Sequence, residues 1–188
     1  VQWMTAGRGV AHSEMPEQED GLMWGFQLWV NLPARDKMNA PRYQEFSPES
    51  IPVVRPVHGT EVKLIAGELA GTTGPVQGIA TRPLYWDISL APDTTYSPLV
   101  PDSHQAFLYF FQGDAMVGPN DGHHAEQGQM TVLGSGNTIK IRSGSKGARL
   151  LLIAGQPLRE PVARYGPFVM NTQDEIHQAF QDYREGRF

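Results

Sequence analysis

The amino-acid sequence predicts an all-β protein, an antiparallel sandwich or jelly roll, with one helix near the C-terminus. Three observations carry this prediction. The 188 residues include 20 glycines and 15 prolines, a content that favours short strands and tight turns over long helices. Short apolar runs alternate with turn residues along much of the chain. A single segment combines a helix start signal with a helical apolar stripe.

The first predicted element is a strand over residues 22–30. Its apolar side chains recur at every second position, which places them on one face of a half-buried strand. These side chains are Trp24, Phe26, Leu28 and Val30.

A domain boundary is predicted after this strand. The stretches 31–42 and 46–56 are rich in proline and polar residues, which is typical of a linker. We therefore expect one domain over residues 1–46 and a second over residues 47–188.

The second domain is predicted to consist of short strands separated by turns. Strand-like runs cover residues 62–66, 84–90, 106–111, 130–133, 138–141 and 149–154. Glycine-containing turns are expected at residues 113–114, 120–122 and 134–137. Antiparallel strands of this spacing favour a sandwich or jelly roll.

The one predicted helix begins at Thr172. The Thr172 hydroxyl can accept a hydrogen bond from the Glu175 amide while the Glu175 carboxylate reaches back, which is a capping box. The following apolar residues lie on one helical face, and a glycine ends the helix. These residues are Ile176, Phe180, Tyr183 and Gly186.

Composition excludes several classes of function. The net charge is −5 and no cluster of five lysines or arginines occurs, so we expect no direct binding to nucleic acid. The chain has no cysteine, which excludes disulfides, thiolate metal sites and cysteine nucleophiles and fits a cytoplasmic protein. The longest apolar stretches are too short to span a membrane.

His12 and Glu14 form the first candidate site. If the segment is extended, residues two apart project from the same face, so an imidazole nitrogen and a carboxylate oxygen can bind one iron, manganese or zinc ion. Two ligands alone rarely hold a metal, and acidic residues continue through Asp20. Spacing alone therefore favours a surface histidine beside an acidic turn.

Other residue patterns give weaker signals for chemistry. His123 and His124 would point to opposite sides of a strand, which favours a solvated loop, and His177 lies beside the helical stripe on the surface. The run Gly7-Arg8-Gly9 lacks the rest of a dinucleotide or phosphate-loop fingerprint. Serine hydrolase chemistry has no support, because no nucleophile elbow is present.

Three segments carry a resemblance to a known family. They are residues 1–16 (VQWMTAGRGVAHSEMP), 27–33 (QLWVNLP) and 165–172 (YGPFVMNT). In these segments the sequence resembles the pirin family, proteins built from two cupin barrels in tandem. The resemblance implies a cupin-type fold and makes His12 and Glu14 ligands of a non-haem Fe(2+), with other divalent metals as alternatives.

The resemblance also implies that part of the metal site is missing. The other two ligands in pirins are histidines of an earlier His-x-His segment, and this spacing does not occur in the 188 residues. We therefore expect residues 1–46 to be the remainder of a first cupin, and residues 47–188 to be a complete, metal-free second cupin. In this chain alone, iron is expected to be absent or incompletely bound.

Three functions follow from the resemblance. An intact protein could be a quercetin 2,3-dioxygenase that binds a small-molecule flavonol, with Glu14 as the catalytic proton acceptor. It could instead be an iron-dependent, redox-sensing regulatory protein that binds a protein partner. The third alternative is that the chain, as it stands, is an inactive fragment.

Overall fold

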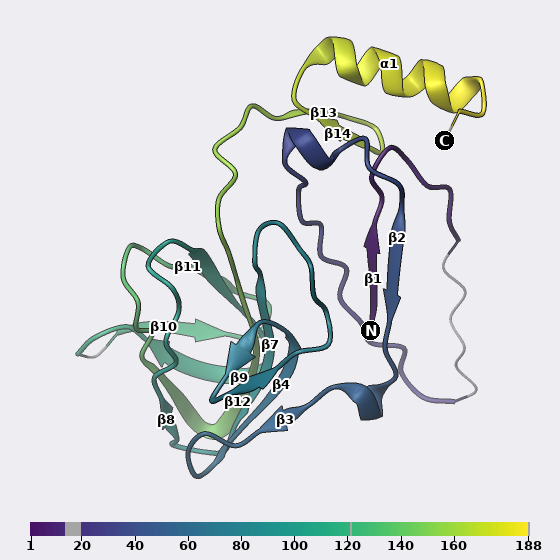
Figure 1. Ribbon diagram of the computed structural model, residues 1–188. Coiled ribbons are helices and arrows are strands. Elements are labelled where there is room, and N and C mark those ends of the chain that lie inside the picture. The colour runs from purple at the N-terminus through teal and green to yellow at the C-terminus, as the bar shows by residue number, and fades with distance from the viewer. Residues whose placement is uncertain (14–19, 121, 188) are drawn as a thin grey trace. The chain divides into compact units, whose positions relative to one another are not determined.

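The structure is a computed structural model that describes residues 1–13, 20–120 and 122–187 (Figure 1). The chain divides into two compact units. The sheet unit comprises Val1–Trp3 and Gln44–Pro157, and the helix unit comprises Met4–Tyr43 and Leu158–Phe188. This division groups residues by their contacts, so the assignment of 1–46 and 47–188 to two cupins stays a prediction.

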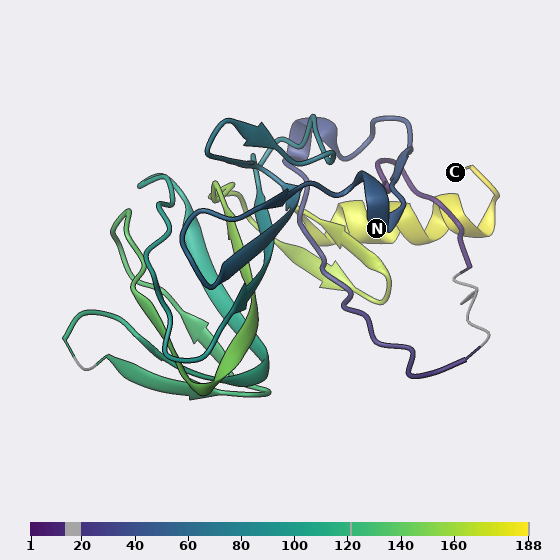
Figure 2. The same cartoon turned by 90° about the horizontal axis from the view of Figure 1, so that it is seen from below.

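The sheet unit is built on one antiparallel sheet with the strand order β10-β9-β12-β7-β4-β3. Two further strands join it, because β11 pairs with β9 and β8 pairs with β12. Figure 2 shows how the long strands curve around the interior of this unit. The bounds are β3 (Val53–Val54), β4 (Thr60–Ala66), β7 (Leu84–Leu90), β8 (Thr95–Tyr96), β9 (Gln105–Val117), β10 (His123–Glu126), β11 (Met130–Val132) and β12 (Ile141–Gly155).

Four neighbouring strands of this sheet bury two rows of large apolar side chains. The first row is Val62, Ile88, Leu150 and Phe110, which lie opposite one another on β4, β7, β12 and β9. The second row is Leu64, Trp86, Leu152 and Leu108. None of these eight residues is more than 1% exposed. Full burial of one such side chain contributes about 1.5–3 kcal/mol, so these rows are the main source of stability in the sheet unit.

The predicted turn at residues 113–114 is wrong, because both residues lie inside β9. Ser143 pairs with Ala115 and Ala148 pairs with Gly113, so residues 144–147 of β12 lie opposite Asp114 alone. The irregularity is a bulge in β12, and Gly113 adopts a positive φ of 67° beside it. A Cβ atom on Gly113 would lie 2.0 Å from the Gly147 carbonyl oxygen. The positive φ of Gly113 therefore accommodates the bulge and does not reverse the chain direction.

The helix unit contains a short hairpin and the α-helix. The hairpin pairs β13 (Ala163–Tyr165) with β14 (Phe168–Met170), and α1 (Gln173–Arg184) follows it directly. A 3₁₀ turn, η1 (Ala34–Asp36), lies in the other segment of this unit. The remaining short elements of the chain are β1 (Gln2–Thr5), which pairs with β2 (Arg42–Glu45), β5 (Glu68–Leu69), which pairs with β6 (Thr72–Thr73), and η2 (Pro48–Ser50).

Helix α1 has the start that the sequence predicts. The Thr172 hydroxyl accepts from the Glu175 amide at 3.2 Å, and the Glu175 carboxylate accepts from the Thr172 amide at 2.8 Å. The predicted stripe packs on the hairpin: Ile176 is buried and the Phe180 ring lies 4.9 Å from the Phe168 ring, measured between centroids.

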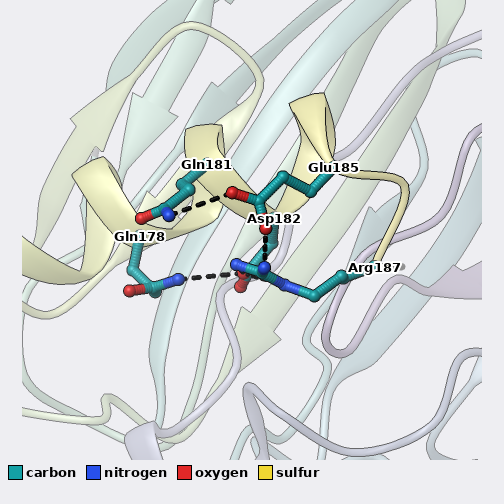
Figure 3. A network of polar contacts seen from close by, with 5 residues as sticks. All are labelled: Gln178, Gln181, Asp182, Glu185 and Arg187. Atoms are coloured by element: carbon teal, nitrogen blue, oxygen red, sulfur yellow. Dashed lines mark hydrogen bonds and ion pairs between the residues drawn. The ribbon is translucent and has the colours of Figure 1, made fainter.

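The end of α1 is also closed by hydrogen bonds. The Gly186 amide donates to the Tyr183 carbonyl and the Arg187 amide donates to the Asp182 carbonyl, which is a Schellman motif. The positive φ of 66° at Gly186 permits this turn. Figure 3 shows the side chains around it, in which Arg187 binds both Asp182 and Glu185.

The strand predicted over residues 22–30 is wrong. The segment has no regular secondary structure, and no other segment among the described residues forms a backbone ladder with it. A strand needs a hydrogen-bonded neighbour, so apolar alternation alone does not produce one. Its large side chains are exposed instead, including Leu22 (83%), Met23 (67%) and Trp29 (60%).

Most of the remaining element predictions are confirmed, with two corrections. The run 84–90 matches β7, and four other runs fall within or overlap β4, β9, β11 and β12. Of residues 138–141, only Ile141 belongs to a strand, and Thr138 makes an isolated bridge with Leu99. His123 and His124 lie on strand β10 and not in a loop, although both are exposed as expected.

Taken as a class, the fold is the predicted one, mostly β with antiparallel sheets and a short C-terminal helix. Among the described residues, no helix has both the length and the apolar character that crossing a bilayer requires.

The bulge predicts a graded response to alanine at two glycines. Gly128 also has a positive φ, of 87°, but a Cβ atom there would contact nothing within 4 Å. Gly128→Ala should therefore cost about 1–2 kcal/mol, from backbone conformation alone. Gly113→Ala adds the clash with Gly147 and should cost at least about 1 kcal/mol more. Urea denaturation of both variants measures the difference, and equal costs would show that β12 can move away.

The buried phenol of Tyr96 predicts a loss of stability at high pH. Burial raises the pKa of Tyr96 to about 12. Because an unfolded tyrosine titrates near pH 10, the folded chain holds this proton more tightly, and the stability it contributes is lost as pH rises from about 10 through about 12. The unfolding free energy of Tyr96→Phe should fall less steeply over this window than that of the wild type. At pH 7 the two should differ by less than about 1 kcal/mol, because the buried hydroxyl has no hydrogen-bond partner among the described residues.

Candidate metal centre

The chain reaches His12 through a tight backbone turn. The Gly9 amide donates to the Ala6 carbonyl at 3.0 Å, and the Arg8 amide donates to the Asn39 carbonyl at 2.9 Å. Gly7 has a φ of 55°, and a Cβ atom on it would lie 2.1 Å from the Asn39 carbonyl oxygen. Gly7 therefore allows two backbones to approach closely at this turn.

The structure places only one of the two predicted metal ligands. His12 is exposed and lies in a segment without regular secondary structure. Glu14 lies outside the described residues. The convergence of His12 and Glu14 on one ion, and the catalytic role of Glu14, thus stay predictions.

The other histidines are engaged locally or lie apart. The His104 Nε2 atom lies 2.8 Å from the Arg82 carbonyl oxygen, and the His124 Nε2 atom lies 3.0 Å from an Asp114 carboxylate oxygen. His58, His123 and His177 are exposed. Across residues 1–13, 20–120 and 122–187, no three acidic or histidine side chains come together as metal ligands.

The donor types fit iron but their number does not. An imidazole nitrogen and a carboxylate oxygen are suitable ligands for Fe(2+). Two donors leave most coordination positions to water, and a site of this kind is not organised before the metal binds. The described residues therefore do not assemble an iron site, and no chemical step through iron follows from them.

The helix unit contains a buried polar cluster that the sequence did not reveal. The side chain of Lys37 is buried, and its ammonium donates to the Asn31 side-chain carbonyl oxygen at 2.8 Å and to the Val169 backbone carbonyl at 2.9 Å. Burial lowers the pKa of Lys37, and the charges of Glu160 and Glu175 oppose this shift. The ammonium joins two segments that are more than 100 residues apart in the sequence.

Two carboxylates extend the Lys37 cluster. Glu160 accepts from the Ala34 amide at 2.7 Å and from the Asn171 side-chain amide at 3.2 Å. The backbone amides of Asn171 and Thr172 donate to Glu175 and hold the pKa of its carboxyl below the usual value. Each of these three charged groups binds backbone or side-chain amide partners among the described residues, so the cluster orders the unit.

The sequence pointed to some residues of the Lys37 cluster but not to Lys37 itself. Val169 and Asn171 belong to the segment 165–172 that carried the family resemblance, but Lys37 lies in the polar stretch that resembled a linker. Lysine is almost always exposed, so composition gave no reason to place it in the interior.

The curved antiparallel sheet of the sheet unit is that of a cupin. The family described as "Pirin C-terminal cupin domain" matches residues 85–188, and the family described as "Pirin" matches residues 1–30. A pirin-like protein of Caulobacter vibrioides is 48% identical over 189 residues, which cover 100% of this chain and 67% of that protein. This chain belongs to the pirin family.

Other relatives agree with this assignment. Human pirin is 43% identical over 190 residues, covering 100% of this chain and 64% of its own length. A solved structure of a quercetin 2,3-dioxygenase from Acinetobacter baumannii superposes with a TM-score of 0.79 at 33% identity, covering 85% of this chain and 55% of that chain. The chain thus spans about two thirds of the length of the curated relatives it matches.

The Lys37 cluster predicts a local loss of stability in the helix unit. Lys37→Met keeps the apolar stem but leaves the Asn31 and Val169 oxygens without their donor, which should cost about 1–3 kcal/mol. Hydrogen exchange should show faster opening of residues 158–184 in this variant. Lys63→Met, at an exposed position of β4, is the matched control and should change nothing beyond about 0.5 kcal/mol. If the amides of residues 158–184 exchange at the wild-type rate in Lys37→Met, the Lys37 ammonium does not stabilise the helix unit.

Proposed function

We propose that this chain is part of a pirin-type non-haem iron dioxygenase that acts on a flavonol such as quercetin. The likeness to the Acinetobacter baumannii quercetin 2,3-dioxygenase carries the proposal, since the TM-score of 0.79 is accompanied by 33% sequence identity. His12 and Glu14 lie within residues 1–30 of this chain, which match the pirin family.

His12 and Glu14 are the proposed iron ligands from this chain. Two further histidines complete the set in the proposed site, and they would have to come from polypeptide beyond these 188 residues, because no His-x-His spacing occurs here. Bound iron would supply a Lewis acid that lowers the pKa of a flavonol hydroxyl group. The Glu14 carboxylate is the proposed acceptor of that proton.

One observation favours a second candidate, an iron-dependent regulatory protein that binds a protein partner. The segment 22–30 exposes Leu22, Met23 and Trp29, and contiguous exposed apolar residues are typical of protein-contact surfaces. In this alternative the iron would change oxidation state and alter a docking surface, and no flavonol would be consumed.

Oxygen uptake distinguishes the two candidates. A chain extended to the length of its pirin relatives is loaded with iron and mixed with quercetin. The dioxygenase proposal expects oxygen consumption that depends on quercetin and is lost in Glu14→Gln. Iron-loaded protein that consumes no oxygen with quercetin would refute it and leave the regulatory alternative.

Metal analysis gives the corresponding prediction for the ligands. In the extended chain, His12→Ala should lower iron content strongly, whereas His104→Ala and His124→Ala should leave it unchanged, because these two histidines bind Arg82 and Asp114 instead. The 188-residue chain purified alone should hold no stoichiometric iron. Elemental analysis that finds about one iron per chain in it would show that two donors suffice or that the ligands are misassigned.

A further inference from the structure

A groove of about 710 Å³ runs along α1 within the helix unit. Tyr165 of β13 forms one side of it, and successive turns of α1 contribute the rest. The α1 residues that matter below are Ile176, His177, Phe180, Gln181 and Arg184. The lining contains no carboxylate.

The apolar side of the groove is fixed by ring packing. Ile176 is 1% exposed, and the Phe180 ring contacts both the Phe168 ring, at 4.9 Å, and the Tyr165 ring, at 5.6 Å between centroids. Tyr165 remains 67% exposed although its ring is packed on one side. The groove therefore offers an ordered aromatic surface that a flat ring can cover.

The polar side of the groove carries one permanently charged group, the Arg184 guanidinium, and the two carboxylates near it in the sequence already have partners. Arg187 binds Asp182 and Glu185, and Gln178 and Gln181 also donate to these two carboxylates (Figure 3). The capping box holds Glu175.

Arg184 lies between Asp182 and Glu185 in the sequence, but both of these carboxylates pair with Arg187. Among residues 1–13, 20–120 and 122–187, the side chains of Arg184 and His177 have no hydrogen-bond or ion-pair partner. Both line the groove and both are exposed. A guanidinium with open donors matches a carboxylate in geometry as well as in charge.

The dimensions of the groove favour a small molecule over a protein as its ligand. Its volume falls in the range of about 300–1,000 Å³ that small-molecule sites occupy. A stable protein interface needs about 800 Å² on each partner, more than one face of a 12-residue helix supplies. We infer that this groove binds a small planar aromatic carboxylate, with its ring against Tyr165 and Phe180 and its carboxylate on Arg184.

This inference does not depend on the proposed iron chemistry. No candidate iron ligand lines the groove, and the 188-residue chain without metal is sufficient for the test. Failure of one proposal therefore leaves the other unaffected.

The test is calorimetric titration of the chain with 2-naphthoate, a two-ring aromatic carboxylate. The wild type should bind one equivalent saturably, and Arg184→Gln should weaken binding at least about tenfold, since an ion-paired hydrogen bond is lost. The uncharged amide 2-naphthamide should bind the wild type more weakly by a similar factor. Tyr165→Ala should weaken 2-naphthoate binding through the ring contact while leaving Arg184 in place.

Arg164→Gln is the matched control, because this arginine also lies beside an aromatic side chain, with its Cζ atom 5.7 Å from the Trp29 ring centroid. It should leave binding unchanged, and circular dichroism should show that each variant keeps its secondary structure. Absence of saturable binding would overturn the inference. So would equal affinity of wild type and Arg184→Gln, or a loss confined to Arg164→Gln.

Discussion

The two-sided pairing of β12 is the constraint on which the sheet unit depends. From Ala148 to Ala154, every residue of β12 has a partner residue on β7 on one side and on β9 on the other. A slip of one residue would turn Leu150 and Leu152 from the core to the outer face and would disrupt both neighbouring pairings at once. The ladder between β12 and β9 has two irregularities. One is the bulge at 144–147, where Gly113 and Gly147 let the two backbones approach, and the other is a shift between Arg149 and Leu150 that leaves Phe111 of β9 without a partner residue on β12.

The helix unit is ordered by a polar constraint instead. Its two segments, Met4–Tyr43 and Leu158–Phe188, are far apart in the sequence, and the buried Lys37 ammonium binds both. A buried ammonium is tolerated only where oxygen acceptors replace its hydrating water molecules. The Asn31 side-chain oxygen and the Val169 carbonyl oxygen must therefore both lie within hydrogen-bond distance of Lys37. This requirement fixes how the two segments are arranged in the unit. Apolar packing alone would restrict their arrangement less strictly.

Sequence reasoning succeeded where the signal is local and failed where it depends on a partner. The capping box and apolar stripe of α1 lie within 12 residues of one another, and β7 shows strict alternation over its seven residues. Residues 22–30 also place apolar side chains at every second position, but a strand needs a neighbouring backbone as well, and the periodicity of one segment does not reveal that neighbour. Gly113 was taken for a turn because a positive φ serves turns and bulges alike, and Lys37 carried no signal because its partners Asn31 and Val169 are defined only by the fold.

Membership of the pirin family does not by itself give this chain an iron site. An identity of 48% over the whole chain establishes the family, because residues throughout the chain contribute to that likeness. The proposed iron site has four donor groups, and this chain would provide two of them, His12 and Glu14. The described histidines of the sheet unit do not add to that number, since no three acidic or histidine side chains come together there, and His104 and His124 bind a carbonyl and a carboxylate oxygen nearby. Substitutions that weaken the sheet unit are therefore expected to differ from those that affect the proposed iron site, and in this proposal the number of ligands, not the degree of similarity, decides whether the chain can hold iron.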